Sequence, residues 1–227
     1  MELNKIIQSF VNEVVKVEVS GKNLINGTVI DLGSDMIVLY NGISFMYIPL
    51  VHIQGFEIDS DNESDIKAPT EFPSVIAEEN EVDLSFSGVL SQVKGKYVEI
   101  YVTGGRPLHG RITSIMNDYF VFNSPIYKTM YISLNHLKWL IPYSQNERPY
   151  GLDGYAILLE PDNNSLASTL EAQVKKVENK MVVFNIDGNK SHIGIVNKIE
   201  GQIVEIQTAR AHPIYLNLHH IKTFHQI

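Results

Sequence analysis

Hydrophobic and polar residues alternate along short segments of this chain, and each group of such segments follows a stretch with helical spacing. In residues 3–14 the apolar side chains recur at intervals of three and four, which predicts one buried face of a short helix. From Val15 to Ser20 apolar and polar residues then alternate, which is typical of a strand with one buried face. The same change of spacing returns within residues 83–102 and 165–186. The pattern therefore predicts three copies of one helix-then-strands unit.

Three short motifs with nearly constant spacing support an internal triplication. The segments YIPLVHI, YISLNHL and YLNLHHI begin at Tyr47, Tyr131 and Tyr215, which lie 84 residues apart. The other recurring residues are a histidine in each of these segments (His52, His136 and His220) and a glycine upstream of it (Gly27, Gly110 and Gly194). A spacing that holds over two intervals is the signature of a repeated structural unit. We interpret these residues as structural landmarks of the repeat, with the tyrosines in the core or at the rim of each unit.

Each predicted unit is small. Turns rich in Gly, Asn and Lys divide it into one helix and five short strands. About 55 residues are too few for two packed sheets, but they can curl into one small barrel. We therefore predict a mainly β protein of three tandem small SH3-like or Sm-like β-barrels, each preceded by a short α-helix.

The helical, alternating and linker-like stretches divide the chain into five segments. These are the first helix and barrel (1–58), an acidic linker (59–82), the second helix and barrel (83–142), a linker rich in Pro, Gly and Asn (143–164), and the third helix and barrel (165–227). Asp83 and Ser165 are the predicted N-cap residues of the second and third helices.

The net charge of −8 comes from one segment rather than from the predicted barrels. Residues 57–83 contain ten acidic residues and one basic residue, so they carry −9 and the remaining 200 residues carry about +1. An acidic segment of this kind is typical of a solvated spacer. A protein that follows a phosphate backbone would instead show a basic stripe on a folded face. The charge pattern therefore disfavours nucleic acid as a partner.

The amino-acid composition excludes several further classes of protein. An apolar fraction of 44% suffices for a folded core, and no apolar run approaches the roughly 20 residues of a membrane span. The first residues lack a secretory apolar stretch, so we expect synthesis in a cytosol without Sec export. Because the chain contains no cysteine, disulfides, thiolate metal sites and cysteine nucleophiles are excluded.

The repeated histidines have two interpretations. They are either metal ligands or bases, or turn residues whose rings bond to backbone between the fourth and fifth strands. Since no Asp or Glu lies at ligand spacing within each unit, we adopt the second interpretation. Further histidines lie near the C-terminus (His212, His219 and His225). The adjacent His219 and His220 are expected on opposite faces of a strand, which disfavours a shared metal ion.

Two other motifs resemble binding loops but fail in detail. The run Asp59–Asp65 imitates the start of a calcium loop, yet Ser64 replaces the required glycine and Thr70 the final acidic ligand. The turn TGGRP (103–107) lacks the ending of a phosphate loop and opens a strand instead of a helix. We therefore predict no catalytic, cofactor-binding or metal-binding residue, and a protein that is not an enzyme.

The motifs carry a resemblance to a known family. The turn TGGRPLHG (103–110) and the strand ends YISLNHLK (131–138) and YLNLHHIK (215–222) resemble spore coat protein B of endospore-forming bacilli and related small single-barrel coat-associated proteins. The resemblance covers residues 1–58 and 84–227. Members of that family carry a Ser- and Lys-rich C-terminal tail that is phosphorylated, whereas this sequence ends at Ile227, so no role that depends on the tail is expected here.

The resemblance implies a structural protein without catalysis. Its expected location is the spore coat or outer spore surface after synthesis in the mother-cell cytoplasm, and its expected partners are other coat proteins. Small barrels also leave strand edges unpaired, which predicts self-association through those edges. The alternative function is an Sm-like RNA-binding protein, which firm, salt-sensitive binding to heparin would favour.

Overall fold

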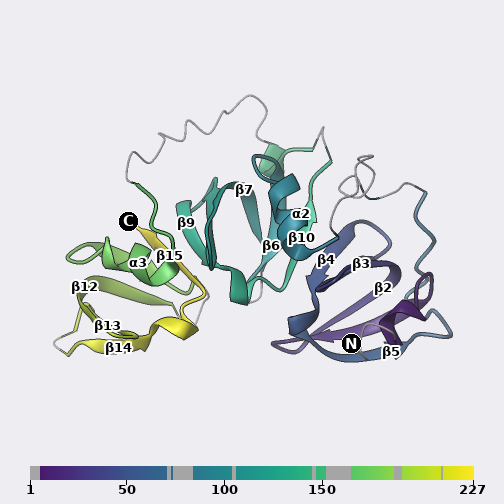
Figure 1. Cartoon of the computed structure of the whole chain (residues 1–227), viewed down its shortest axis with the longest axis horizontal. Helices are drawn as coiled ribbons and strands as arrows, with labels where there is room; N and C mark the ends of the chain where they lie inside the picture. Colours follow the sequence, from purple (N-terminus) through teal and green to yellow (C-terminus); the bar gives the residue numbers. More distant parts are fainter. Residues whose placement is uncertain are drawn as a thin grey trace. The chain divides into compact units, whose positions relative to one another are not determined.

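The structure is a computed structural model that describes residues 6–70, 73, 84–103, 106–144, 147–151, 165–186, 191–210 and 212–227 (Figure 1). Its described strands form one antiparallel sheet of 15 strands, in the order β14-β13-β12-β11-β15-β9-β8-β7-β6-β10-β4-β3-β2-β1-β5. The predicted mainly β fold is therefore confirmed, while the division into three small barrels stays a prediction.

Five strands recur in the same order in each repeat, and a named helix precedes them in the second and third repeats. The first repeat contains β1 (Val14–Val19), β2 (Asn23–Leu32), β3 (Met36–Tyr40), β4 (Phe45–Pro49) and β5 (Ile53–Ile58). The second contains α2 (Phe86–Gln92), β6 (Tyr97–Tyr101), β7 (Leu108–Ile115), β8 (Tyr119–Ser124), β9 (Lys128–Ser133) and β10 (Trp139–Pro142). The third contains α3 (Leu170–Lys175), β11 (Met181–Phe184), β12 (His192–Glu200), β13 (Ile203–Gln207), β14 (Ile214–Asn217) and β15 (Thr223–Gln226).

A single 3-10 turn separates the fourth strand from the fifth in every repeat. These turns are η1 (Leu50–His52), η2 (Leu134–His136) and η5 (Leu218–His220), and a further 3-10 turn, η3, spans Pro149–Gly151. His219 and His220 therefore lie in a turn, and the prediction that they sit on opposite faces of a strand is wrong. The landmark histidines all end such a turn, as the sequence interpretation expected of a residue between these two strands.

The helix starts differ from those predicted. Ser85 caps α2 by accepting a hydrogen bond from the N–H of Gly88, and Thr169 caps α3 through the N–H of Ala172. The prediction of Ser165 as a cap is wrong because the helix begins one turn later, at Leu170. Asp83, the other predicted cap, lies outside the described residues. Ser and Thr side chains accept hydrogen bonds from the free N–H groups of a first helical turn as well as Asp does. The spacing of apolar residues alone therefore could not identify which residue caps each helix.

The landmark glycines lie where the second strand of each repeat bends against the third. A Cβ atom on Gly27 would lie 3.0 Å from the carbonyl oxygen of Tyr40, and Cβ atoms on Gly110 and Gly194 would overlap the carbonyls of Asn123 and Gln207. A bulge follows two residues later in every repeat, between Val29 and Asp31, Ile112 and Ser114, and Val196 and Lys198. Bulges increase the local twist of a strand pair, so the glycine lets the bent strand approach its neighbour.

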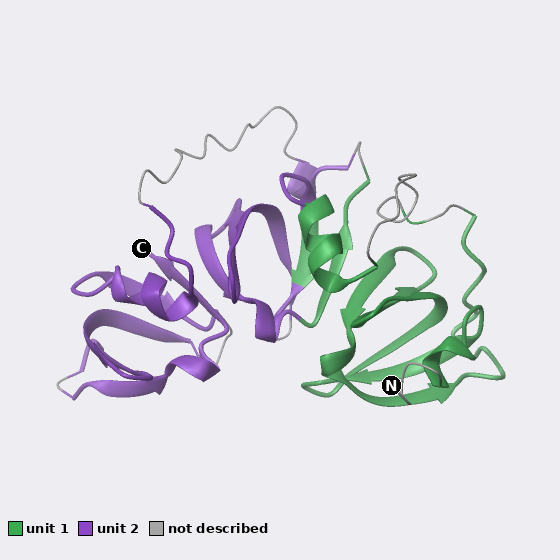
Figure 2. Ribbon diagram, in the orientation of Figure 1, with its two compact units in different colours: residues 1–93, 98–100, 138–146 green, residues 94–97, 101–137, 147–227 purple. Residues whose placement is uncertain are grey.

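The chain divides into two compact units (Figure 2). The first unit comprises residues 1–93, 98–100 and 138–146, and the second comprises 94–97, 101–137 and 147–227. In the second unit, side chains of β8 and β9 join those of the third repeat in one apolar core that includes Tyr119, Val174 and Phe184. The units therefore do not follow the repeat boundaries, since β10 of the second repeat belongs to the first unit.

Candidate functional site

Two seams join the fourth strand of one repeat to the fifth strand of the next, and they are the most distinctive feature of the described chain. In the second unit β9 pairs with β15, with Tyr131 opposite Phe224 and Ile132 opposite Thr223. The rings of Tyr131 and Phe224 stack at 4.6 Å between centroids, and both are buried. The N–H of Ser133 donates to the carbonyl oxygen of Lys222 at 2.9 Å. This seam thus combines backbone pairing with a buried aromatic stack.

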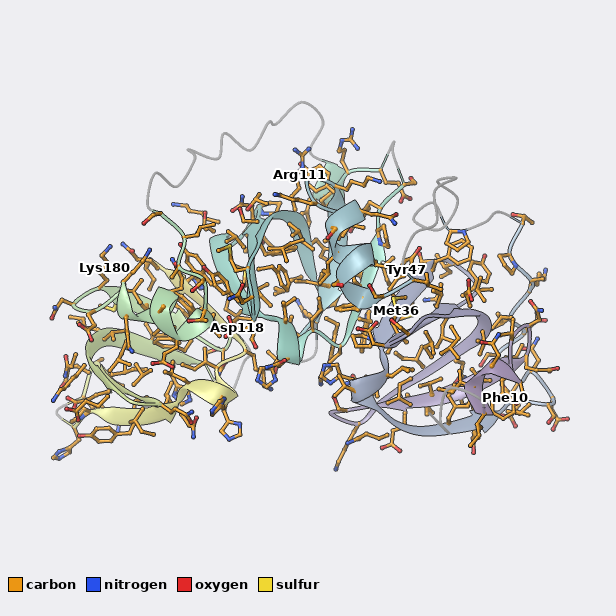
Figure 3. The ribbon with its side chains drawn as sticks, viewed as in Figure 1. Phe10, Met36, Tyr47, Arg111, Asp118 and Lys180 are labelled. Carbon is orange, nitrogen blue, oxygen red and sulfur yellow. The ribbon has the colours of Figure 1, made fainter. Side chains whose placement is uncertain are left out.

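The first unit contains a seam of the same design. There β10 pairs with β4, and Leu140 lies opposite Tyr47 (Figure 3). Tyr47 is 1% exposed and Leu140 is fully buried. Tyr47 and Tyr131 occupy the same repeat position, as do Leu140 and Phe224, so both seams share one register. Two independent pairings in one register indicate that the repeat is built for this contact.

A carboxylate strengthens each seam by holding the helix of the following repeat. Oδ1 of Asp35 accepts a hydrogen bond from the N–H of Phe86 at 2.7 Å, and Oδ1 of Asp118 accepts one from the N–H of Leu170 at 2.8 Å. Carboxylates are favoured at helix N-termini because free N–H groups point there. The backbone carbonyls of the same two aspartates accept from Leu50 and Leu134 in the 3-10 turns. In the third repeat Gln202 occupies this position, and its carbonyl accepts from Leu218.

A buried tyrosine adds a second link between the second and third repeats. The hydroxyl of Tyr119 donates to the carbonyl oxygen of Ala167 at 2.6 Å and lies 3.3 Å from Oε1 of Gln173 on α3. Burial, with a smaller contribution from the charge of Asp118, raises the pKa of Tyr119 to about 12. The phenol therefore stays protonated and acts as a structural donor at neutral pH.

The landmark histidines have different partners in the three repeats. Nε2 of His136 lies 3.0 Å from the carbonyl oxygen of His219, so this ring bonds to backbone across the β9–β15 seam. Nδ1 of His52 lies 3.2 Å from the hydroxyl of Ser20, and this ring is largely buried. His220 is exposed. Among the described residues, no group of three or more His, Asp or Glu side chains is placed to hold a metal ion.

One cleft in the second unit has a basic lining. It encloses about 510 Å³, and its lining includes Lys128, Lys176 and Lys180 together with Tyr131 and Gln173. Lys176 donates to the carbonyl oxygen of Ser165. The described residues that line it include no Asp, Glu or His side chain. The lysines of the cleft can attract an anion.

The start of the predicted acidic linker is attached to the first repeat. Nζ of Lys16 lies 2.8 Å from Glu63 and 3.6 Å from the buried carboxylate of Asp59. The hydrogen bond to Glu63 raises the pKa of Lys16, and the same contact lowers the pKa of Glu63. Asn26 also donates to the hydroxyl of Ser64 at 2.6 Å. The acidic run that resembles a calcium loop is thus held by a lysine instead of presenting an open cage of carboxylates.

Sequence reasoning found the landmarks but missed the residues that make the seams. It named Tyr47 and Tyr131 without their partners, and it did not single out Asp35, Asp118 or Phe224. A signal was present, because Asp35 and Asp118 lie 83 residues apart, which is the spacing of the first two landmark glycines. What the spacing cannot reveal is that the contact runs from one repeat to the next.

Comparison with known proteins places these features in a family. The profile described as the third domain of YwrJ matches residues 169–224. The chain is 36% identical over 227 residues to the uncharacterized protein YwrJ of Bacillus subtilis (strain 168), an alignment that spans 97% of this chain and 99% of that protein. It is 23% identical over 141 residues to spore coat protein B of the same organism. That alignment spans 62% of this chain and 35% of that protein.

No helix in the described part of the chain has the length and apolar character needed to cross a membrane.

Proposed function

The chain belongs to the family of YwrJ, and from this premise we propose that it is a structural protein of the bacterial spore coat that acts by assembly with other proteins and without catalysis. The weak similarity to spore coat protein B supports a coat role. The expected site is the coat or outer spore surface, reached after synthesis in the mother-cell cytoplasm. Its proposed partners are other coat proteins.

The observation that carries this proposal is the strand seam. Strand addition supplies affinity through backbone hydrogen bonds and specificity through alternate side chains, and it requires no reactive group. The chain uses this contact twice, at β4–β10 and β9–β15. A protein that already joins its own repeats in this way is suited to join other protein strands in the same way.

The repeat architecture completes the proposal. Within the first repeat the strands pair in the order β5-β1-β2-β3-β4, which is a five-stranded meander with its last strand returned beside the first. A strongly bent sheet of this order can curl into a small SH3-like or Sm-like barrel. We propose that each repeat is such a barrel, opened at its fourth and fifth strands.

The test combines location and binding. A fluorescent fusion expressed at its natural level during sporulation is expected to form a shell on the developing spore. The purified chain is expected to co-sediment with components of a spore-coat extract. A fusion that stays dispersed in the mother cell, together with a chain that binds nothing in the extract, would overturn the coat assignment.

The basic cleft favours one alternative, an anionic ligand such as RNA. Lys128, Lys176 and Lys180 line it, and a positively charged groove is a common element of nucleic-acid binding. Heparin chromatography separates the two functions. Elution at low salt supports the coat proposal, and firm retention that weakens steeply with salt supports the alternative.

A further inference from the structure

The outermost strands of the described sheet are β14 and β5. Of the three fourth strands, β4 and β9 are covered by the fifth strand of the next repeat, whereas the outer side of β14 has no pairing partner among the described residues. Of the three fifth strands, β10 and β15 pair with the fourth strand of the preceding repeat. The outer side of β5 has no pairing partner among the described residues. The described sheet thus has one unpaired fourth strand, β14, at one edge and one unpaired fifth strand, β5, at the other.

The exposed fractions of side chains at matching positions of the three repeats show which side chains a partner strand would cover. Tyr47 and Tyr131 are 1% and 7% exposed inside the seams, whereas Tyr215 on β14 is 62% exposed. On the other side, Leu140 and Phe224 are fully buried, while Phe56 on β5 is partly exposed. An exposed aromatic side chain on an unpaired strand edge is a typical site of strand addition.

We infer that β14 of one copy pairs antiparallel with β5 of a second copy, with Tyr215 opposite Phe56. This inference rests on the proposed assembly function and names its partner as the same chain. The contact is head-to-tail, because the two copies contribute different surfaces, and such contacts generate closed rings or open chains of subunits.

The internal seams predict the hydrogen bonds of this contact. The N–H of Ser133 donates to the carbonyl of Lys222, so at equal positions the N–H of Asn217 would donate to the carbonyl of Gln54 in the second copy. Nε2 of His136 contacts the carbonyl of His219, so His220 would contact the carbonyl of Val51. Val51 is 82% exposed, which leaves that turn accessible.

Charge is complementary along the same register. Glu57 and Asp61 lie on or just after β5, and both are exposed. Arg210 and His212 lie just before β14 and are also exposed. In an antiparallel pair the end of β5 meets the start of β14, so acidic side chains would face basic ones. Charge complementarity of this kind favours the correct partner and register.

The contact between copies is expected to be weaker than the internal seams. Gln202 replaces the carboxylate that Asp35 and Asp118 provide, so the charged helix contact of those seams has no counterpart. Pro213, which has no N–H to donate, bounds the pairing at the start of β14. The internal seams also profit from covalent linkage, which raises the effective concentration of the second strand. Association should therefore depend on protein concentration.

Cysteine cross-linking tests the register directly, because the chain has no natural cysteine. One purified protein carries Gln54→Cys and a second, distinguishable by mass, carries Asn217→Cys. Both positions are exposed, but Asn217→Cys removes the side-chain oxygen that accepts from the N–H of His219 at 2.9 Å, so circular dichroism must first show that both variants fold like the natural chain. Under mild oxidation a mixed disulfide dimer is expected. The control pairs Asn217→Cys with Ile58→Cys, which lies four residues along β5, roughly 13 Å away, beyond the reach of a disulfide.

The outcomes are distinct. A mixed dimer with the first pair and little with the control supports the inference. Equal yields of both pairs, or only dimers between identical proteins, would overturn it. A chain carrying both Gln54→Cys and Asn217→Cys supplies a further test: a disulfide within one monomer would show that the two edges meet in a single chain, and would overturn pairing between copies.

Sedimentation of an edge variant separates this inference from the proposed function. Tyr215→Glu adds charge next to the acidic end of β5, and it should raise the concentration needed for self-association by at least about tenfold. Tyr150→Glu, at a tyrosine of similar exposure (56%), is the matched control and should leave association unchanged. If Tyr215→Glu self-associates as the natural chain does, the inference fails. Binding to coat extract by either variant bears only on the proposed function.

Discussion

Phe224 stacks on Tyr131 across the β9–β15 seam, with the ring planes 18° apart, although the two residues are 93 positions apart in the sequence. Phe224 also lies near Phe184, at 5.9 Å between ring centroids. One residue of the last strand therefore ties the second repeat to the core of the third. Loss of this ring should affect both repeats.

Phe224→Ala is expected to lower the free energy of unfolding by about 3–5 kcal/mol, since it removes a fully buried aromatic ring. Urea unfolding followed by circular dichroism measures the change. The control is Phe56→Ala at the same repeat position, where the ring is partly exposed and stacks only on Phe10, at 5.3 Å. An equal loss in both variants would contradict the importance of the seam.

Asp118→Ala is expected to destabilise the second unit by about 1 kcal/mol, because the first turn of α3 loses a hydrogen-bonded carboxylate. Asp118→Asn keeps an acceptor oxygen and should cost less. The same urea titration separates the two variants. If both variants unfold like the natural chain, neither the charge nor the acceptor oxygen of Asp118 stabilises α3.

Gly194→Ala is expected to destabilise the third repeat by about 1–3 kcal/mol, because the added methyl group overlaps the carbonyl of Gln207 and forces the strands apart. Gly55→Ala is the control, since its new Cβ would lie 3.4 Å from the nearest atom, a carboxylate oxygen of Glu18. Thermal unfolding compares the two. A control as unstable as Gly194→Ala would contradict close approach as the cause of the loss, because Gly→Ala by itself lowers the entropy of the unfolded chain and favours folding.

Stability should fall as pH decreases below about 6.5. Burial lowers the pKa of His225 in the folded chain, and the buried Nδ1 atom of this residue has no hydrogen-bond partner within the described part of the chain. As pH falls, the unfolded chain therefore binds the proton first, which favours unfolding. His225→Gln should flatten the dependence between pH 7 and pH 5, measured by urea unfolding at each pH. The exposed His212→Gln is the control and should leave the slope unchanged.

The periodic pattern was sufficient to predict the mainly β class and the short alternating strands that make up the sheet. These features depend on local spacing, which the residues of one repeat determine. The seams depend on pairing between Tyr47 and Leu140 or between Tyr131 and Phe224, which lie far apart in the chain. Sequence reasoning therefore expected an open edge on every repeat, whereas the described internal edges are paired with each other.

The exposure of Tyr215 illustrates the same limit. Its segment, YLNLHHI, closely matches those of Tyr47 and Tyr131, so pattern alone placed all three tyrosines in a core or at a rim. Its environment differs because, among the described residues, no strand pairs with the outer side of β14 and covers it. Burial at this position is decided by the neighbouring repeat and not by the segment itself.

The β4–β10 seam also sets a delay during protein synthesis. Leu140 leaves the ribosome 93 residues after Tyr47, which at roughly 5–20 residues per second corresponds to about 5–20 s. Throughout that interval the edge of β4 is complete but uncovered, while neighbouring ribosomes on the same message carry identical edges. A nascent first repeat can thus accept the fifth strand of another nascent chain in place of its own, so the order of translation becomes part of how each molecule selects its partner.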